Sequence, residues 1–218
     1  MAARAGRRAL VTGGSRGAGW SRPDRAPEDP GRPRLFFAVP LPDVVREGIR
    51  PIRDAVQAGV GDGHARIRWV RIESLHLTLR FLGPTPLDEA PALGLAGTAA
   101  AARVAPFEVT IGGAGAFPAD GPPRTLWLGL RAGTEGLARL AAELDALLPP
   151  GDSRTFMPHL TIARTDGLRL ASAAARALAV AADGHEWSFR ADRLVLFRSH
   201  LGTGPAWYEP ITEAPLGG

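Results

Sequence analysis

Cysteine and lysine are both missing from this sequence of 218 residues. The absence of cysteine excludes disulfide bonds and thiolate chemistry, and it is compatible with a reducing cytoplasm. The absence of lysine makes every basic residue other than histidine an arginine, whose forked guanidinium suits contacts with phosphate. No apolar run approaches the length of a membrane span, and the N-terminal segment lacks the apolar stretch of a signal peptide. We therefore expect a soluble, cytoplasmic protein.

Charged residues are unevenly distributed along the chain. The formal net charge is +4, but residues 1–34 hold eight arginines and only three acidic residues, so the remainder is close to neutral. A near-neutral remainder does not predict a surface that coats nucleic acid, and the basic segment adds at most a weak, salt-sensitive attraction to phosphate. Because residues 1–33 are rich in arginine, proline and glycine, we expect a disordered leader there and a single two-lobed domain over residues 34–218.

One stretch of this leader resembles a cofactor-binding turn. Residues 9–19, ALVTGGSRGAG, are similar to the opening of short-chain dehydrogenases, in which an apolar strand leads into a glycine-rich turn and a helix that holds pyrophosphate. Prolines at 23, 27, 30 and 33 exclude such a helix here. That family also needs a Tyr-x-x-x-Lys pair, which a chain without lysine cannot supply. We interpret the stretch as part of the leader and expect no cofactor.

From Arg34 onwards, short apolar segments typical of strands alternate with periodic segments typical of helices. Residues 112–123 are expected to form a loop. Several strands are joined by short turns, which favours antiparallel pairing and an α+β fold. The expected strands are 35–39, 67–70, 76–82, 107–111, 125–130, 187–191 and 194–199. The expected helices are 41–59, with a bend at Pro51, and 87–104, 134–148 and 168–182.

One short pattern occurs twice. The stretch 76–79, HLTL, returns as 159–162, HLTI. Side chains alternate between the two faces of a strand, so each copy places a histidine and a threonine on one face and two apolar residues on the other. We expect two pseudo-symmetric antiparallel lobes with flanking helices, one copy in each, around a central cleft.

If the two strands face each other, His76, Thr78, His159 and Thr161 converge on one small volume. Imidazole titrates near neutrality, so one ring can accept a proton while the other donates one. Threonine hydroxyls can donate hydrogen bonds to phosphate oxygens, so the set suits an anionic phosphorus centre. A zinc site is the alternative for paired histidines, but no further ligand lies at a suitable spacing from either motif, and we expect no metal.

Several stretches resemble the two-histidine phosphoesterases and, within them, the RNA 2′,3′-cyclic phosphodiesterases, historically called 2′-5′ RNA ligases. The resemblance covers about residues 34–215. The stretches that carry it are RLFFAVPLP from Arg34, RWV from Arg68, HLTLRFLG from His76, LWLGL from Leu126, PHLTIAR from Pro158, and LVLFRS from Leu194 with YEP from Tyr208.

This resemblance implies a bilobal α+β catalytic domain that hydrolyses RNA 2′,3′-cyclic phosphate ends to 2′-phosphates without a metal or cofactor. His76 would donate a proton to the departing 3′ oxygen, and His159 would act as the base that activates water. Thr78 and Thr161 would hold phosphate oxygens. The implied partners are RNA or nucleotide cyclic phosphate ends, with no membrane and no obligate protein partner.

Two substrate-binding residues, Phe81 and Arg164, follow from the same resemblance, each five positions after a histidine. An odd offset places them on the opposite strand face, so they reach the cleft only if the strands twist, bulge or end there. Alternation alone favours Arg80, which could equally be a surface charge. Further aromatic residues either stack on bases at the rim of the cleft or pack in the core. These are Trp69, Phe117, Trp127 and Tyr208.

Two alternatives to hydrolysis remain open. The first is joining of RNA ends through a 2′-5′ bond, the reverse of cleavage, which water at high concentration disfavours. The second is a nucleotide-binding module that keeps the cleft without catalysis. The natural RNA, the process served and the oligomeric state do not follow from the sequence.

Overall fold

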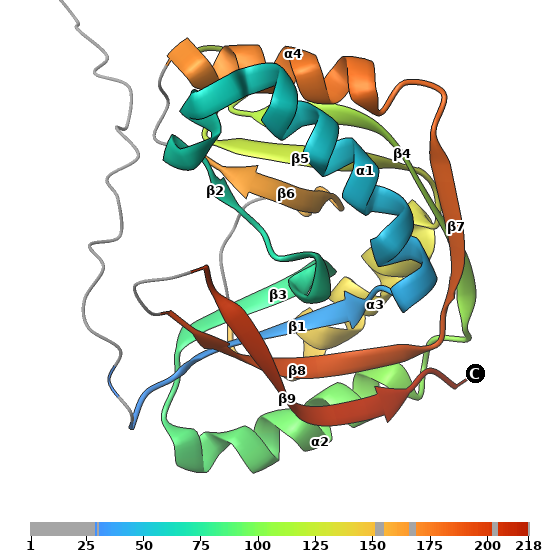
Figure 1. The fold of residues 1–218 in the computed structure, drawn as a ribbon. Helices are drawn as coiled ribbons and strands as arrows, with labels where there is room; N and C mark the ends of the chain where they lie inside the picture. Colours follow the sequence, from blue (N-terminus) through green and yellow to red (C-terminus); the bar gives the residue numbers. More distant parts are fainter. Residues whose placement is uncertain (1–28, 30, 151–154, 166–168, 202–204, 218) are drawn as a thin grey trace, which may run out of the picture.

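The computed structural model describes residues 29, 31–150, 155–165, 169–201 and 205–217 (Figure 1). The dehydrogenase-like stretch 9–19 and most of the expected leader lie outside the described residues. Within the described part of the chain, no helix is both long and apolar enough to cross a bilayer.

The described residues form strands, α-helices and short 3₁₀ turns. The strands are β1 (Arg34–Pro40), β2 (Arg68–Trp69), β3 (His76–Pro84), β4 (Phe107–Phe117), β5 (Thr125–Ala132), β6 (Leu160–Arg164), β7 (Glu186–Ala191), β8 (Arg193–His200) and β9 (Trp207–Pro215). The helices are α1 (Asp43–Val60), α2 (Ala90–Ala101), α3 (Thr134–Leu147) and α4 (Arg169–Ala181), and the 3₁₀ turns are η1 (Gly61–Arg66), η2 (Ile72–Ser74) and η3 (Leu87–Glu89).

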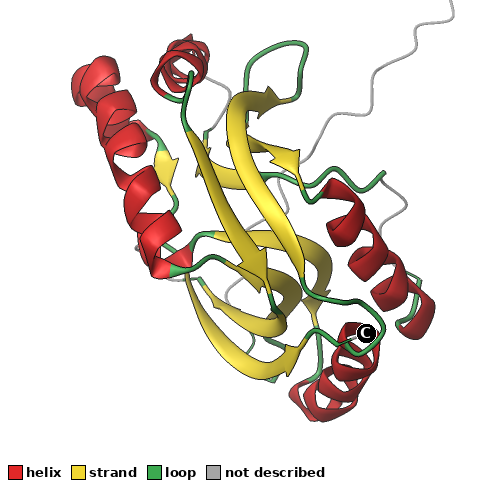
Figure 2. Cartoon of the chain, turned by 90° about the vertical axis from the view of Figure 1, so that its right-hand side faces the viewer, coloured by secondary structure: helices red, strands yellow, loops and turns green. Residues whose placement is uncertain are grey.

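All the strands belong to one curled antiparallel sheet (Figures 1 and 2). Its order is β7-β4-β5-β6-β3-β1-β8-β9, and β2 pairs with β6 on the side not occupied by β5. The two halves, β6-β5-β4-β7 and β3-β1-β8-β9, meet where β3 lies beside β6. The predicted α+β fold with two antiparallel halves is confirmed, and the halves share one continuous sheet.

Each half of the sheet is covered on its outside by two helices (Figure 2). α1 and α4 pack against each other and against β4, β5 and β7, whereas α2 and α3 pack over β3, β8 and β9 (Figure 1). In α1, a spacing of three and four residues puts the buried side chains on one helix face. Burial of each such side chain contributes roughly 1.5–3 kcal/mol. These side chains are Val45, Ile49, Ile52 and Val56.

Two expectations from the sequence were wrong. Residues 112–123 are not all loop, because β4 continues to Phe117 and pairs with β5. Glycine has a low strand propensity, which hid this part of β4, but Gly115 is needed because a Cβ there would lie 2.2 Å from the Trp127 ring. The prediction also missed β9, whose two prolines argue against a central strand. β9 lies at the sheet edge, where proline is tolerated.

Arg80 lies on the face of the sheet that the helices cover, not on the other face. Its guanidinium pairs with Asp145 of α3 and donates a hydrogen bond to the carbonyl oxygen of Pro149. The side chain is only 12% exposed. Alternation of side chains, which favoured Arg80 as a functional residue, was therefore wrong at this position.

We predict that Arg80→Ala lowers the free energy of unfolding by about 1.5–3 kcal/mol, because it removes hydrogen bonds made by a buried charged group. The matched control is Arg103→Ala, which removes an arginine that pairs with Glu143 but is 55% exposed. That control should lose less than about 1 kcal/mol. Urea unfolding at pH 7 measures both, and equal losses would contradict the structural role of Arg80.

Candidate active site

The two central strands touch at one pair of leucines. Leu77 of β3 lies opposite Leu160 of β6, and both side chains are buried on the helix side of the sheet. Because side chains alternate along a strand, the residues before and after each leucine face the other way. We call this the site face, and its central residues are His76, Thr78, His159 and Thr161.

These four residues are close neighbours. Continuing the antiparallel register by one residue each way sets His76 opposite Thr161 and Thr78 opposite His159. Residues directly opposite have Cβ atoms about 4.5–5.5 Å apart, and the diagonal pair, here the two histidines, about 7–8 Å. The charge of His159 lowers the pKa of His76, which agrees with this proximity. Both rings and both hydroxyls can therefore reach one phosphate group.

A bulge in β3 changes the face of the residues that follow it. Between Thr78 and Arg80, the ladder with β1 contains one extra residue, Leu79. The alternation shifts by one, so Phe81 returns to the site face. Its ring lies 5.8 Å from that of Phe36, which is its partner on β1.

β6 has the same irregularity at the corresponding position. In its ladder with β5, Ile162 is the extra residue between Thr161 and Ala163. Arg164 therefore lies on the site face, as Phe81 does in β3. Both bulges fall three positions after a histidine, and each reverses the face that strict alternation assigns to the residue five positions after it.

Both histidines are oriented by a main-chain carbonyl two positions earlier. His76 Nδ1 lies 2.8 Å from the oxygen of Ser74, and His159 Nδ1 lies 2.7 Å from the oxygen of Met157. A carbonyl oxygen can only accept, so Nδ1 carries the proton and donates in both cases. Nε2 is then the atom of each ring that is left to accept or donate a proton.

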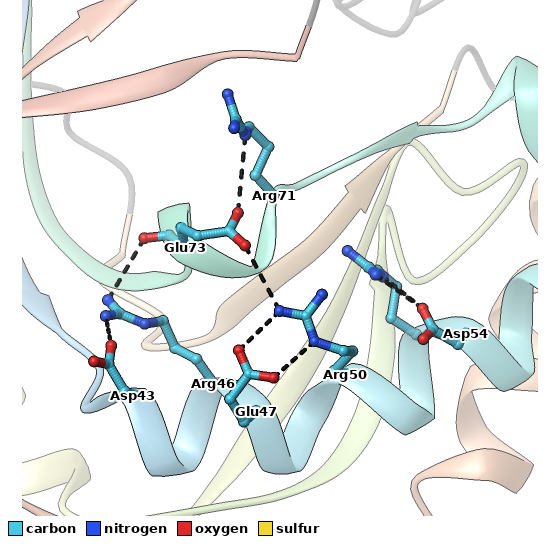
Figure 3. Close-up of polar contacts among 8 residues, drawn as sticks. Asp43, Arg46, Glu47, Arg50, Asp54, Arg71 and Glu73 are labelled. Carbon is cyan, nitrogen blue, oxygen red and sulfur yellow. Dashed lines mark hydrogen bonds and ion pairs between the residues drawn. The ribbon is translucent and has the colours of Figure 1, made fainter.

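Arginines join the turn that carries Ser74 to helix α1 (Figure 3). Arg46 donates to the main-chain carbonyl of Glu73 at 3.5 Å, and Arg50 lies 3.6 Å from its carboxylate. Arg71 approaches the other carboxylate oxygen at 3.8 Å. Each exposed pair contributes at most about 1 kcal/mol. The contacts of Arg46 and Arg50 link η2 to α1 beside Ser74, whereas the contact of Arg71 lies within the turn.

The surroundings lower the pKa of both histidines. The pKa of His76 is lowered to about 4, mainly by burial. The charges of Arg164 and His159 also lower it, whereas the hydrogen bond to the Ser74 carbonyl raises it. Burial also lowers the pKa of His159. The hydrogen bond to the Met157 carbonyl opposes this shift, and the charge of Arg164 adds to it. Both shifts favour the neutral form of the ring, and at pH 7 His76 is neutral in the free protein.

Aromatic rings surround both histidines. The rings with centroids 4.9–6.2 Å from a histidine are Phe36, Phe197 and Tyr208 at His76, and Phe117 and Trp127 at His159. Of the four aromatic residues singled out from the sequence, three thus lie at the site, and Trp69 packs against the core. Phe36 and Phe197 were not predicted from the sequence, because they stand in apolar runs in which both strand faces look alike.

Arg164 connects the histidines with Tyr208 and Arg68. Burial lowers the pKa of the Arg164 guanidinium, Tyr208 raises it and Arg68 lowers it. Burial raises the pKa of the Tyr208 hydroxyl, against the charge of Arg164. Because its charge also acts on both histidines, Arg164 is placed to contact an anion held between them.

The other described histidine rings lie outside this group. His185 stacks on Trp187, and His200 stacks on Trp207 and bonds the carboxylate of Glu209 at 2.8 Å. Among the described residues, no three His, Cys, Asp or Glu side chains form a group that could hold a metal ion.

The lowered pKa of His76 predicts how stability depends on pH. In the unfolded chain His76 binds a proton below about pH 6.5, whereas in the folded protein it binds one only near pH 4. The free energy of unfolding is therefore unaffected by this group above pH 6.5 and decreases as the pH falls towards 4. Between pH 7 and pH 4, the free energy of unfolding of His76→Gln should fall by about 3 kcal/mol less than that of the wild type. The exposed His185→Gln is the control. Urea titrations that give all three proteins the same loss would contradict burial of a neutral His76.

Comparisons with known proteins identify the family of this chain. The chain matches the family model of the 2′-5′ RNA ligase superfamily over residues 36–203. It is 31% identical over 190 residues to the RNA 2′,3′-cyclic phosphodiesterase of Escherichia coli (strain K12), covering 84% of this chain and 96% of that protein. It is 36% identical over 143 residues to the protein of the same name from Thermus thermophilus, covering 60% of this chain and 68% of that protein.

Solved structures are similar over the same region. A crystal structure of Escherichia coli LigT complexed with NADP+ aligns with a TM-score of 0.67 at 30% identity, covering 86% of this chain and 99% of that chain. LigT complexed with 3′-AMP aligns with a TM-score of 0.64 at 28% identity, covering 85% of this chain and 98% of that chain. The match to the family model includes both copies of the His-x-Thr pattern. This chain belongs to the 2′-5′ RNA ligase superfamily.

Proposed function

We propose that this protein hydrolyses the 2′,3′-cyclic phosphate at the end of an RNA and leaves a 2′-phosphate. The observation that supports this best is the pair of histidines on one site face. In each, Nδ1 donates a hydrogen bond to a main-chain carbonyl, which leaves Nε2 for proton transfer. The relatives from Escherichia coli and Thermus thermophilus, both named RNA 2′,3′-cyclic phosphodiesterase, support the same substrate.

In this reaction, water attacks phosphorus and the bond between phosphorus and the 3′ oxygen breaks. His159 accepts a proton from the attacking water, and His76 donates one to the departing 3′ oxygen. The rings come from neighbouring strands and meet diagonally, which suits attack and departure on opposite sides of the phosphorus. Thr78 and Thr161 donate hydrogen bonds to the non-bridging oxygens, on which negative charge develops.

His76 must carry a proton in this role, although its pKa is about 4 in the free protein. A bound phosphodiester anion brings a negative charge next to the ring and offsets the positive charge of Arg164, which raises the pKa of His76. Substrate binding and protonation of the acid are therefore linked. Arg164 contacts the same anion, and the ring of Phe81, 57% exposed, offers a surface on which a base can stack.

The name of the superfamily favours one further activity, the joining of RNA ends through a 2′-5′ bond. In it, a 5′-hydroxyl attacks the same phosphorus in place of water, and the bond to the 3′ oxygen breaks as in hydrolysis. Both reactions use the same acid and base, so the histidine arrangement serves either. Because water is present at high concentration, we propose that hydrolysis is the main reaction and joining the minor one.

We expect the purified protein to convert 2′,3′-cyclic nucleotides and short cyclic-phosphate RNAs to 2′-phosphates. His76→Ala and His159→Ala should each lower kcat by about 10²–10⁴-fold, and EDTA should have no effect. His185→Ala, outside the site, is the control. Activity that EDTA abolishes and a metal restores would contradict a metal-free reaction. Tight nucleotide binding without turnover would indicate a binding module instead.

Removal of either hydroxyl should cost less than removal of a histidine. Thr78→Val and Thr161→Val keep the side-chain shape but lose a donor to the phosphate, so each should lose about 2–4 kcal/mol of transition-state stabilisation in kcat/KM. Thr98→Val in α2, whose hydroxyl bonds the carbonyl of Gly94, serves as the control for the substitution itself. Full activity of both site variants would remove the threonines from the mechanism.

A further inference from the structure

Two arginines lie side by side on the site face, beyond the histidines. Arg68 of β2 is the direct cross-strand partner of Arg164 of β6. The next pair in this ladder is Trp69 with Ala163, and Ala163 is fully buried while Trp69 packs against the core. Since side chains alternate, both arginines point to the opposite side, which is the site face.

This arrangement places like charges next to each other. Positive side chains directly opposite on neighbouring strands are destabilising, and the charge of Arg68 lowers the pKa of Arg164. Tyr208 is the other group whose charge acts on Arg164, and its raised pKa keeps its hydroxyl protonated at neutral pH. Among the described residues, no carboxylate forms an ion pair with Arg164. A phosphate bound beside Arg164 would supply that guanidinium with an opposite charge, and Arg68 is its direct cross-strand neighbour.

The two arginines differ in their relation to the reacting phosphate. The charge of Arg164 lowers the pKa of both His76 and His159. Arg68 acts on Arg164 but is not among the charges that shift either histidine. Arg68 is therefore one step further from the position of the cyclic phosphate. An anion that it binds together with Arg164 is a neighbouring one.

We propose that Arg68, beside Arg164, binds the phosphodiester that precedes the terminal nucleotide of the RNA. This inference rests on the proposed function of the site, because it assumes that the terminal phosphate lies between the histidines. A guanidinium fork matches two phosphate oxygens and reads no base, so the contact is independent of RNA sequence. The protein then favours RNA ends of two or more nucleotides over mononucleotides.

The test compares two product-like ligands, adenosine 2′-phosphate and the dinucleotide ApA with a terminal 2′-phosphate. Calorimetry at several salt concentrations gives the dissociation constants. The wild type should bind the dinucleotide about tenfold more tightly. Arg68→Gln should abolish most of this gain and reduce the salt slope for the dinucleotide by about 0.7, the value for one neutralised phosphate of a single strand.

Two further variants complete the design. Arg68→Lys keeps the charge and should keep the salt slope, and its retained binding also shows that the fold tolerates a change at this position. Arg131→Gln removes an arginine of β5 that pairs with Glu186 away from the site, and it controls for net charge. Equal weakening of both ligands by Arg68→Gln, or equal wild-type affinities for them, would overturn the proposal. Turnover of a mononucleotide cyclic phosphate by the wild type tests the proposed function separately.

Discussion

The site depends on the pairing of two buried leucines, Leu77 and Leu160, where the halves of the sheet meet. A strand that slips by one residue turns every side chain to the other face. Such a slip here would expose the leucines and bury two histidines and two threonines under the helices. The cost of that exchange fixes the register, and the register brings two imidazoles and two hydroxyls to one place.

The bulges after each histidine are a second constraint of the same kind. They occur at equivalent positions in β3 and β6, so the two halves share the same backbone irregularity. The side chains that they deliver differ: Phe81 is apolar and Arg164 is charged. Three aromatic rings surround His76 and two surround His159. The site is therefore symmetric in its backbone and asymmetric in its chemistry, which agrees with the different roles proposed for the two histidines.

Much of this arrangement could be predicted from the sequence. The repeated His-x-Thr pattern between apolar residues indicated two similar strands, and the positions of most helices and strands followed from periodicity. The bulges could not be predicted from alternation, because an extra residue depends on pairing with β1 and β5. β9 and the second part of β4 were hidden by proline and glycine, whose positions are explained only by an edge strand and by the ring of Trp127. Arg68 and Phe36 gained significance only from their cross-strand partners.

The central question for this site is whether one phosphate contacts both histidines. Titration of the protein with adenosine 2′-phosphate, followed by NMR of the imidazole C2 protons, reports on each ring separately. We predict that the signals of His76 and His159 shift with the same dissociation constant, and that the pKa of both rings rises in the complex. A signal that stays unchanged at saturation for either ring would contradict a shared phosphate site.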